Sequence, residues 1–133
     1  MTPEALVQEA MQAMQNAYAP YSGFKVGAAL LCADGTVYTG CNIENAAYGP
    51  SNCAERTAIF KAVSEGHRTF AAIAVVGGKN GAVTDIFPPC GVCRQVMQEF
   101  CVPVYMGRGD GSYVAVRLDA LLPYGFSAEK YMR

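Results

Sequence analysis

The chain has 133 residues, of which 52% are hydrophobic and 16% charged, so it can bury the core of one domain and is not a disordered protein. Its 10 basic and 11 acidic residues give a formal net charge of −1, and the absence of any basic run argues against a nucleic acid partner. The N-terminus has no basic segment followed by an apolar one, and no apolar run is long enough to cross a bilayer; we therefore expect a cytoplasmic protein with no membrane partner.

The first third of the chain predicts a helix followed by a β-hairpin. The helix begins at Thr2-Pro3-Glu4, where a hydroxyl cap, a proline and a carboxylate stand in the order that a first helical turn favours. Two apolar runs follow, Lys25–Leu31 and Thr36–Cys41, and Asp34-Gly35 between them is a pair typical of hairpin turns.

The middle of the chain predicts a loop, a second helix and a buried strand. Asparagine, glycine and proline are concentrated in residues 45–52, and an apolar helical face then runs from Ala54 to a stop at Gly66. Residues 71–76 are continuously apolar, as expected for a strand buried on both faces, and 77–87 is predicted to be a loop.

The last third predicts a helix over 91–100, strands over 103–106 and 113–117, and a short helix near Asp119. A strand, a helix and a strand in this order imply a crossover with at least one parallel pairing. The predicted fold class is therefore α/β, a three-layer α/β/α arrangement with a mixed sheet of about five strands and helices on both faces. We expect residues 1–133 to form a single catalytic domain.

Three of the six cysteines occur in a pattern typical of a metal site. Cys53-Ala54-Glu55-Arg56 and Pro89-Cys90-Gly91-Val92-Cys93 both stand where a loop enters a predicted helix. Cys90 and Cys93 are one helical turn apart, so their sulfurs lie on the same side, and Cys53 is the third candidate ligand. Helix N-termini favour the negative charge of a thiolate, which metal binding requires.

The number of ligands indicates a catalytic site, because three protein ligands leave the fourth position of tetrahedral zinc for water. Glu55, two residues after Cys53, is suited to act as the general acid and base beside that water. Of the remaining candidates, Cys32, Cys41 and Cys101 are interpreted as small buried hydrophobes, and His67 as an exposed residue after the helix stop.

These residues bring the sequence close to a known family. The chain resembles the small homotetrameric cytidine deaminases that carry a three-cysteine zinc site, within the cytidine/deoxycytidylate deaminase superfamily. Five segments carry the resemblance in this order: Tyr21-Ser22-Gly23-Phe24-Lys25-Val26-Gly27, Gly40-Cys41-Asn42-Ile43-Glu44-Asn45, Cys53-Ala54-Glu55-Arg56, Pro89-Cys90-Gly91-Val92-Cys93-Arg94-Gln95 and Leu121-Leu122-Pro123-Tyr124-Gly125-Phe126.

The resemblance implies hydrolytic deamination of cytidine and deoxycytidine in pyrimidine salvage, with one Zn²⁺ per subunit and a nucleoside as substrate. It also implies a homotetramer whose sites are completed by neighbouring subunits. The roles it implies are zinc ligation by Cys53, Cys90 and Cys93, proton transfer by Glu55, ribose binding by Asn42 and Glu44 alternating on one strand, base contacts by Phe24 and Ala54, and contacts across subunits by Tyr48 and Phe126.

Arg56 is a candidate for tuning the metal, since three thiolates leave the site with net negative charge and an arginine can hydrogen-bond to sulfur. Three other functions remain open: a deaminase of a related aminopyrimidine, a polynucleotide deaminase and a non-catalytic module stabilised by zinc. The near-neutral charge argues against the polynucleotide substrate.

Overall fold

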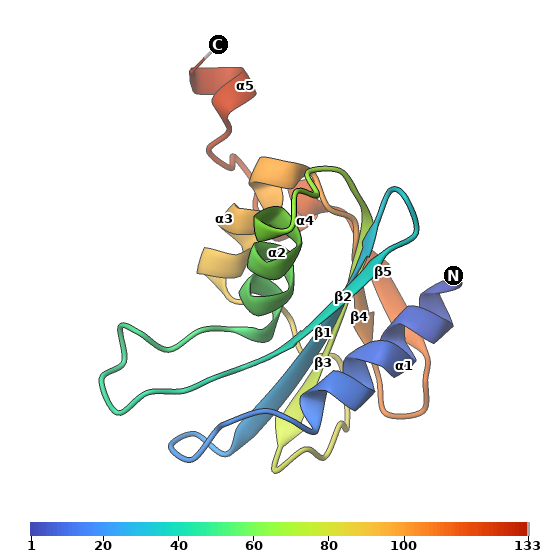
Figure 1. The fold of residues 1–133 in the computed structure, drawn as a ribbon, viewed down its shortest axis with the longest axis vertical. Helices are drawn as coiled ribbons and strands as arrows, with labels where there is room; N and C mark the ends of the chain where they lie inside the picture. Colours follow the sequence, from blue (N-terminus) through green and yellow to red (C-terminus); the bar gives the residue numbers. More distant parts are fainter. Residues whose placement is uncertain (133) are drawn as a thin grey trace.

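The structure is a computed structural model, and it describes residues 1–132. Within these residues five strands form one mixed sheet in the order β2-β1-β3-β4-β5 (Figure 1). β3 and β4 pair in parallel and the other neighbours are antiparallel, which confirms the expected mixed sheet. The strands are β1 (Phe24–Cys32), β2 (Val37–Cys41), β3 (Phe70–Lys79), β4 (Val104–Gly107) and β5 (Tyr113–Val116).

Helices cover both faces of the sheet, as the three-layer prediction requires. α1 lies on one face, and α2 and α3 lie together on the other (Figure 1). Two short helices, α4 and α5, follow β5 near the C-terminus. The bounds are α1 (Pro3–Met14), α2 (Ala54–Ser64), α3 (Gly91–Phe100), α4 (Leu118–Leu121) and α5 (Ala128–Tyr131).

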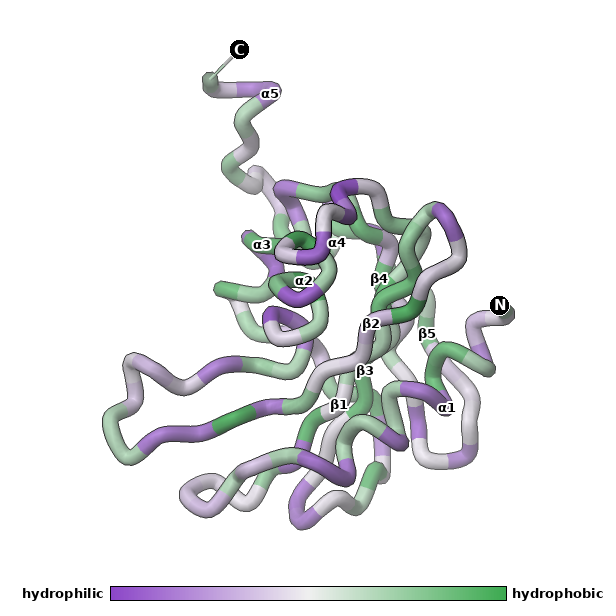
Figure 2. The backbone as a smooth tube through the Cα atoms, in the orientation of Figure 1, coloured by the Kyte–Doolittle hydropathy of each residue, from purple (hydrophilic) through white to green (hydrophobic). Residues whose placement is uncertain are grey.

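The core divides between the two faces of the central strands. In β3, Ile73 and Val75 pack toward α2 and α3, whereas Ala72, Ala74 and Val76 pack toward α1. Successive side chains of a strand point to opposite faces, so burial on both faces requires the continuous apolar run that the sequence shows. Figure 2 shows hydrophobic residues concentrated along the central strands, whereas the outer loops mix hydrophilic and hydrophobic residues.

A glycine sets the position of α2 on the sheet. A Cβ atom at Gly40 would stand 2.5 Å from the Ala54 carbonyl oxygen and 2.7 Å from the Ala58 nitrogen. Only a residue without a side chain lets the start of α2 lie this close to β2. The N-terminus of α2, which carries Cys53 and Glu55, is therefore held directly against the sheet.

The sequence prediction was wrong about the end of β3. The strand continues to Lys79 instead of ending at Val76, because it pairs with β1 along its full length and Lys79 lies opposite Phe24. Gly77 and Gly78 lack the apolar side chains from which a strand is predicted. Because β3 extends this far, the loop that follows it begins beside the start of β1.

Two segments project from the layered body. The loop between β2 and α2 extends away from the sheet, and the C-terminal segment with α5 extends beyond α3 and α4 (Figure 1). Among residues 1–132, no helix has both the length and the apolar character needed to span a bilayer.

Candidate active site

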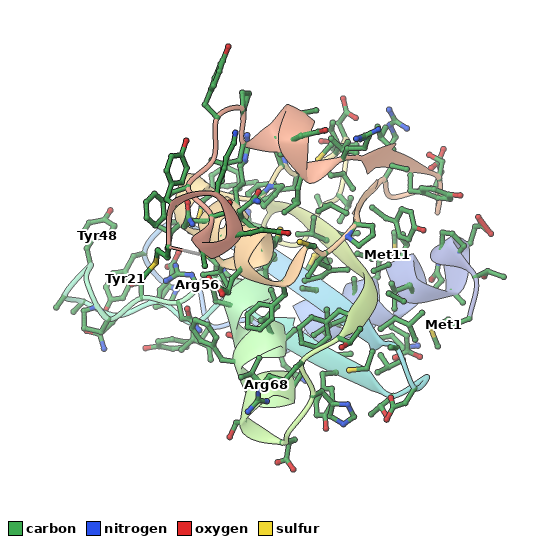
Figure 3. All side chains as sticks on the ribbon, turned by 90° about the horizontal axis from the view of Figure 1, so that it is seen from above. Met1, Met11, Tyr21, Tyr48, Arg56 and Arg68 are labelled. Carbon is green, nitrogen blue, oxygen red and sulfur yellow. The ribbon has the colours of Figure 1, made fainter. Side chains whose placement is uncertain are left out.

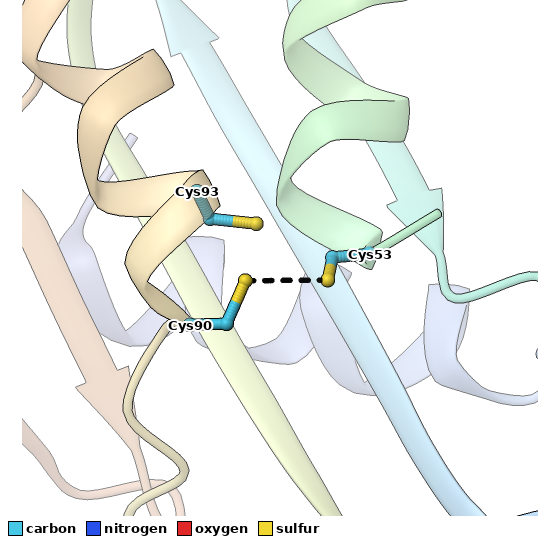
Figure 4. Close-up of side chains that lie close together, drawn as sticks. All are labelled: Cys53, Cys90 and Cys93. Atoms are coloured by element: carbon cyan, nitrogen blue, oxygen red, sulfur yellow. Dashed lines mark hydrogen bonds between the residues drawn. The ribbon is translucent and has the colours of Figure 1, made fainter. Parts of the chain in front are cut away.

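The three predicted cysteines meet where α2 and α3 begin. Cys53 is the N-cap of α2, Cys90 is the N-cap of α3, and Cys93 lies in the first turn of α3 (Figure 4). Their sulfur atoms all lie within 4.8 Å of one another, and the Sγ atoms of Cys53 and Cys90 are 3.6 Å apart. Neither N-cap side chain makes a capping hydrogen bond to the backbone of its own helix, so the sulfurs are available to a common ligand.

The surroundings of the sulfurs favour thiolates. The hydrogen bond from the Cys93 thiol lowers the pKa of Cys53 to about 5, and Arg56 reinforces this by donating from Nη2 to the Cys53 Sγ at 3.3 Å. The pKa of Cys93 is raised in turn, because its thiol is hydrogen-bonded to Cys53 and because it is buried. Three closely spaced sulfurs at two helix N-termini are the donor set that zinc prefers, so zinc fits this site.

Glu55 is buried beside the cysteines without a hydrogen-bond partner for one oxygen. The residue is only 3% exposed, and its Oε1 atom makes no hydrogen bond within the described chain. Burial raises the pKa of Glu55 to about 7. A carboxyl group that both gives and takes protons near neutral pH, with one oxygen unpaired, is suited to proton transfer to a bound molecule.

A cavity of about 270 Å³ opens onto Glu55 and two of the cysteines. Among the predicted substrate-binding residues, Phe24, Asn42 and Ala54 line it. A larger cavity of about 560 Å³ lies between the end of α3 and β4 and β5, and contains none of the predicted site residues. The smaller cavity is lined by Ser22, Phe24, Val26, Asn42, Cys53, Ala54, Glu55, Phe87, Pro88 and Cys90.

Phe87 also lines the cavity, although no sequence pattern predicted it. The rings of Phe24 and Phe87 have their centroids 6.0 Å apart, so the two aromatic side chains form one wall of the cavity. Lys79 covers the Phe24 ring, with Nζ 5.1 Å from the centroid, and donates from Nζ to the Ser22 carbonyl at 2.8 Å. This placement depends on the extension of β3, which the sequence pattern did not indicate.

Asn42 faces the cavity while fixing the start of β1. Its Oδ1 accepts from the Val26 amide at 2.8 Å, and its Nδ2 donates to the Phe24 carbonyl at 2.7 Å. β2 ends at Cys41, so the expectation that Asn42 and Glu44 alternate on one strand was wrong. Two isolated bridges at Ile43, one to Tyr18 and one to Asn52, hold the segment instead.

Glu44 lines a neighbouring cavity of about 170 Å³, and Ser22 lines both cavities. The Glu44 carboxylate accepts from the amides of Tyr21 at 2.9 Å and Ser22 at 3.1 Å, and also from the Ser22 hydroxyl. These hydrogen bonds, chiefly the one from the Ser22 hydroxyl, hold the pKa of Glu44 below its usual range. Glu44 is therefore ionised and fixed next to the cavity that contains Glu55.

Tyr48 and Phe126 lie away from Glu55 within one chain. Tyr48 is 90% exposed in the projecting loop (Figure 3) and lines the Glu44 cavity. Phe126 is 56% exposed and stacks on Tyr131, and its carbonyl accepts from the Gln95 side chain at 2.9 Å. The structure thus places both residues on the two projecting segments.

The other predictions about cysteine and histidine were right only in part. Cys32 is buried and Cys41 half-buried, but Cys101 is exposed, because it ends α3 in a left-handed conformation with φ of 52°. His67 is half-buried and not exposed, because its ring packs against Tyr38.

Comparison with known proteins agrees with this site. The family model described as "Cytidine and deoxycytidylate deaminase zinc-binding region" matches residues 1–107. The chain is 53% identical over 132 residues to a cytidine deaminase of Sporosarcina psychrophila, covering 97% of this chain and 94% of the relative. It is 42% identical over 136 residues to a probable cytidine deaminase of Dictyostelium discoideum, covering 95% and 84%.

A solved structure leads to the same family. The crystal structure of a cytidine deaminase from Burkholderia pseudomallei superimposes with a TM-score of 0.86 at 49% identity, covering 95% of this chain and all of the other. The structure from Mycobacterium tuberculosis gives 0.79 at 39% identity, covering 95% and 98%. Sequence, fold and three-sulfur cluster together show that the chain belongs to the cytidine and deoxycytidylate deaminase family of zinc enzymes.

Proposed function

We propose that this chain hydrolyses cytidine and deoxycytidine to uridine and deoxyuridine with release of ammonia. The observation that carries the proposal is the position of Glu55, buried with one unpaired oxygen beside the three cysteines and lining the 270 Å³ cavity. The names of relatives at 53% identity support the same substrate. An apolar cavity with a few polar groups is also the kind of site that binds a small molecule.

Cys53, Cys90 and Cys93 are the residues that would hold the zinc ion. When bound, zinc supplies the Lewis acidity that makes water a nucleophile at neutral pH. The protein contributes preformed sulfur ligands at two helix starts, so little rearrangement is needed when the metal binds.

Glu55 carries the protons of the reaction. Hydrolytic deamination adds the oxygen of water to C4 of the base and breaks the bond between C4 and the amino nitrogen. Glu55 takes a proton from the attacking water and delivers it to N3 of the ring. It then takes the remaining proton from the hydroxyl added at C4 and passes it to the amino group, which leaves as ammonia while the C4 carbonyl forms. Its pKa of about 7 suits both halves of this cycle.

Asn42 and Glu44 bind the ribose, and both retain capacity to do so. Asn42 uses one N–H and one oxygen lone pair within the chain, which leaves one of each. The Glu44 carboxylate has about four acceptor positions, of which three are used, so it can accept a ribose hydroxyl. Phe24 packs against the base and the backbone of Ala54 contacts it, which positions C4 beside Glu55.

Arg56 compensates the charge of the thiolates. Its Nη2 donates to the Cys53 sulfur, and its Nε is buried without a partner in the described chain. A guanidinium held here lowers the electron density that sulfur donates to the metal, which favours ionisation of water. Arg56 also lowers the pKa of Cys53, so Arg56→Ala is expected to weaken zinc affinity because the Cys53 thiolate forms less readily. Activity should fall as well, because the charge of the thiolates is no longer compensated, and retention of both would remove Arg56 from the mechanism.

Tyr48 and Phe126 complete sites in neighbouring subunits of a homotetramer. They stand on segments that project from the body, and a partner subunit would cover their exposed rings (Figure 1). The chain acts as one catalytic domain over 1–133, in the cytoplasm, and serves pyrimidine salvage by acting on free nucleosides. The net charge of −1 agrees with a nucleoside substrate, because a protein that binds a nucleic acid strand needs an excess of basic residues.

The test follows the ultraviolet absorbance of cytidine after addition of zinc-loaded protein, in parallel with Glu55→Gln. We expect the wild type to convert cytidine, and Glu55→Gln to lose activity by about 10²- to 10⁴-fold while retaining its zinc. Glu65→Gln, at the other end of α2, is the matched control and should be fully active.

Two outcomes would overturn the proposal. Conversion of a related aminopyrimidine but not of cytidine would reassign the substrate and keep the chemistry. Inactivity toward all of them, with unfolding on zinc removal, would indicate a module that zinc only stabilises.

A further inference from the structure

A second group of metal-binding side chains lies at the other end of β1 and α2, away from the active site. It consists of Cys32, the last residue of β1, Asp34 in the hairpin turn, and His67 after the end of α2. One ligand atom from each lies within 4.8 Å of the others, as in the active-site cluster. β1 spans nine residues at about 3.3 Å per residue, so the group lies about 26 Å from the start of the strand at Phe24.

The backbone holds the three residues in place. The Ala33 amide donates to the Thr69 carbonyl at 2.9 Å, which ties the hairpin to the segment after His67. The Cys32 amide donates to the Thr36 carbonyl at 2.8 Å, and the His67 amide donates to the Ala62 carbonyl at 2.9 Å. Neither the strand end nor the histidine is therefore on a free loop.

The side chains are oriented as well. Asp34 uses Oδ1 to accept the Thr36 amide at 3.0 Å, which leaves Oδ2 directed at His67, 3.7 Å from its Nδ1. The His67 ring packs edge-on against Tyr38, with centroids 5.3 Å apart. The separation between Oδ2 and Nδ1 is too long for a hydrogen bond and is about 0.2 Å beyond the ~3.3–3.5 Å at which tetrahedral zinc holds a nitrogen and an oxygen ligand, so a small side-chain rotation brings both atoms onto one ion.

We propose that Cys32, Asp34 and His67 bind a second divalent transition-metal ion, with zinc as the metal that their donor set favours. Sulfur, imidazole nitrogen and carboxylate oxygen are all ligands of zinc, whereas magnesium and calcium select oxygen alone. The Asp34 side chain is 59% exposed and that of His67 24%, so an ion can enter from solvent and keep water as a fourth ligand.

The charges around the site favour a cation. His67 follows the C-terminal end of α2, where the helix dipole is negative, and the Asp34 carboxylate faces it. The bound ion would link the hairpin to the end of α2 and so stabilise the fold without taking part in catalysis.

The experiment titrates zinc into protein whose active site already holds one equivalent. His67 is the only histidine in the chain, so its ring nitrogens give a single set of NMR signals. We expect a second equivalent of zinc to bind, to shift these signals and to raise the unfolding temperature. Elemental analysis after dialysis against low zinc should give two ions per chain.

Two variants and a control locate the ion. His67→Asn and Asp34→Asn should bind only one zinc ion per chain, while Cys101→Ser, which removes an exposed thiol elsewhere, should bind two. The amide NMR spectrum of each variant shows whether the fold is retained. A single zinc ion in the wild type, unmoved His67 signals, or a second ion that survives both substitutions would each overturn the proposal.

Discussion

α2 has a cluster of metal-binding side chains near each of its ends, and the two clusters differ in the helix terminus that they face. At the N-terminus, Cys53 meets Cys90 and Cys93, where two helix dipoles and Arg56 favour negatively charged sulfur. Beyond the C-terminus, His67 meets Asp34 and a thiol whose pKa is raised. The position of a cysteine relative to the helix ends therefore decides how readily its thiol loses the proton that metal binding displaces.

The clusters also differ in what lies beside them. The first opens onto a cavity of about 270 Å³ and includes an ionisable carboxyl group with an unpaired oxygen. The second is packed against Tyr38 and lines none of the cavities described above. We therefore assign catalysis to the first and stabilisation to the second.

Loss of one sulfur ligand from the first cluster is expected to have the largest effect, and it shows most clearly that this cluster carries the catalytic activity. Cys93→Ala takes a buried ligand from the first cluster, and we expect it to abolish zinc binding at the active site and to lower deaminase activity by more than about 10³-fold, because water then keeps its ordinary pKa. Zinc content and cytidine turnover are the measurements. Cys101→Ala is the matched control, and a Cys93→Ala enzyme with normal turnover would exclude the three-cysteine site.

A change at Gly40 tests the packing that holds the first cluster. Gly40→Ala places a Cβ atom 2.5 Å from the Ala54 carbonyl oxygen, and we expect a loss of about 1–3 kcal/mol in the free energy of unfolding together with weaker zinc binding. Denaturant unfolding measures the first and metal competition the second. Gly49→Ala is the matched control, because that glycine has no neighbour within 4 Å and does not have a positive φ. An unchanged Gly40→Ala protein would show that α2 can shift without harm.

The sequence predicted the first cluster from determinants that are local to each of its two motifs, although Cys53 and Cys90 are 37 positions apart and meet only in the folded chain. Cys90 and Cys93 are one turn apart, each motif stands at a helix start, and these relations need no knowledge of the tertiary structure. The helices α1 to α4, and the five strands up to their ends, were predictable for the same reason, since periodicity and turn residues lie within each segment. The short helix α5 was not predicted.

The remaining features depend on contacts between distant segments. Cys32 and His67 are separated by α2 and meet only when the hairpin pairs with the segment before β3. Phe87 joins the cavity because β3 extends along β1 through glycines that carry no apolar signal. Asn42 and Glu44 are held by the two isolated bridges of Ile43 and by hydrogen bonds to residues about twenty positions earlier, which strand periodicity does not reveal.

The smallest expected effect concerns Ser22, which links the cavity of Glu55 to that of Glu44. The Ser22 hydroxyl donates to the Glu44 carboxylate and is the main cause of its lowered pKa, so Glu44 stays ionised at lower pH than an ordinary glutamate. Ser22→Ala removes this donor, and the pKa of Glu44 should rise. The carboxylate then begins to be protonated at a higher pH, where it can no longer accept a ribose hydroxyl from that oxygen.

We expect KM for cytidine to rise by about 2- to 10-fold in Ser22→Ala, which corresponds to a hydrogen bond of ~0.5–1.5 kcal/mol, with the larger increase at acid pH. Carboxyl ¹³C NMR follows the titration of Glu44, and initial rates at several pH values give KM. Ser112→Ala, in the turn before β5, removes a hydroxyl that donates to Asp110 and should leave KM unchanged. A Ser22→Ala enzyme whose KM and Glu44 titration both match the wild type would show that the two backbone amides alone keep Glu44 ionised and in place.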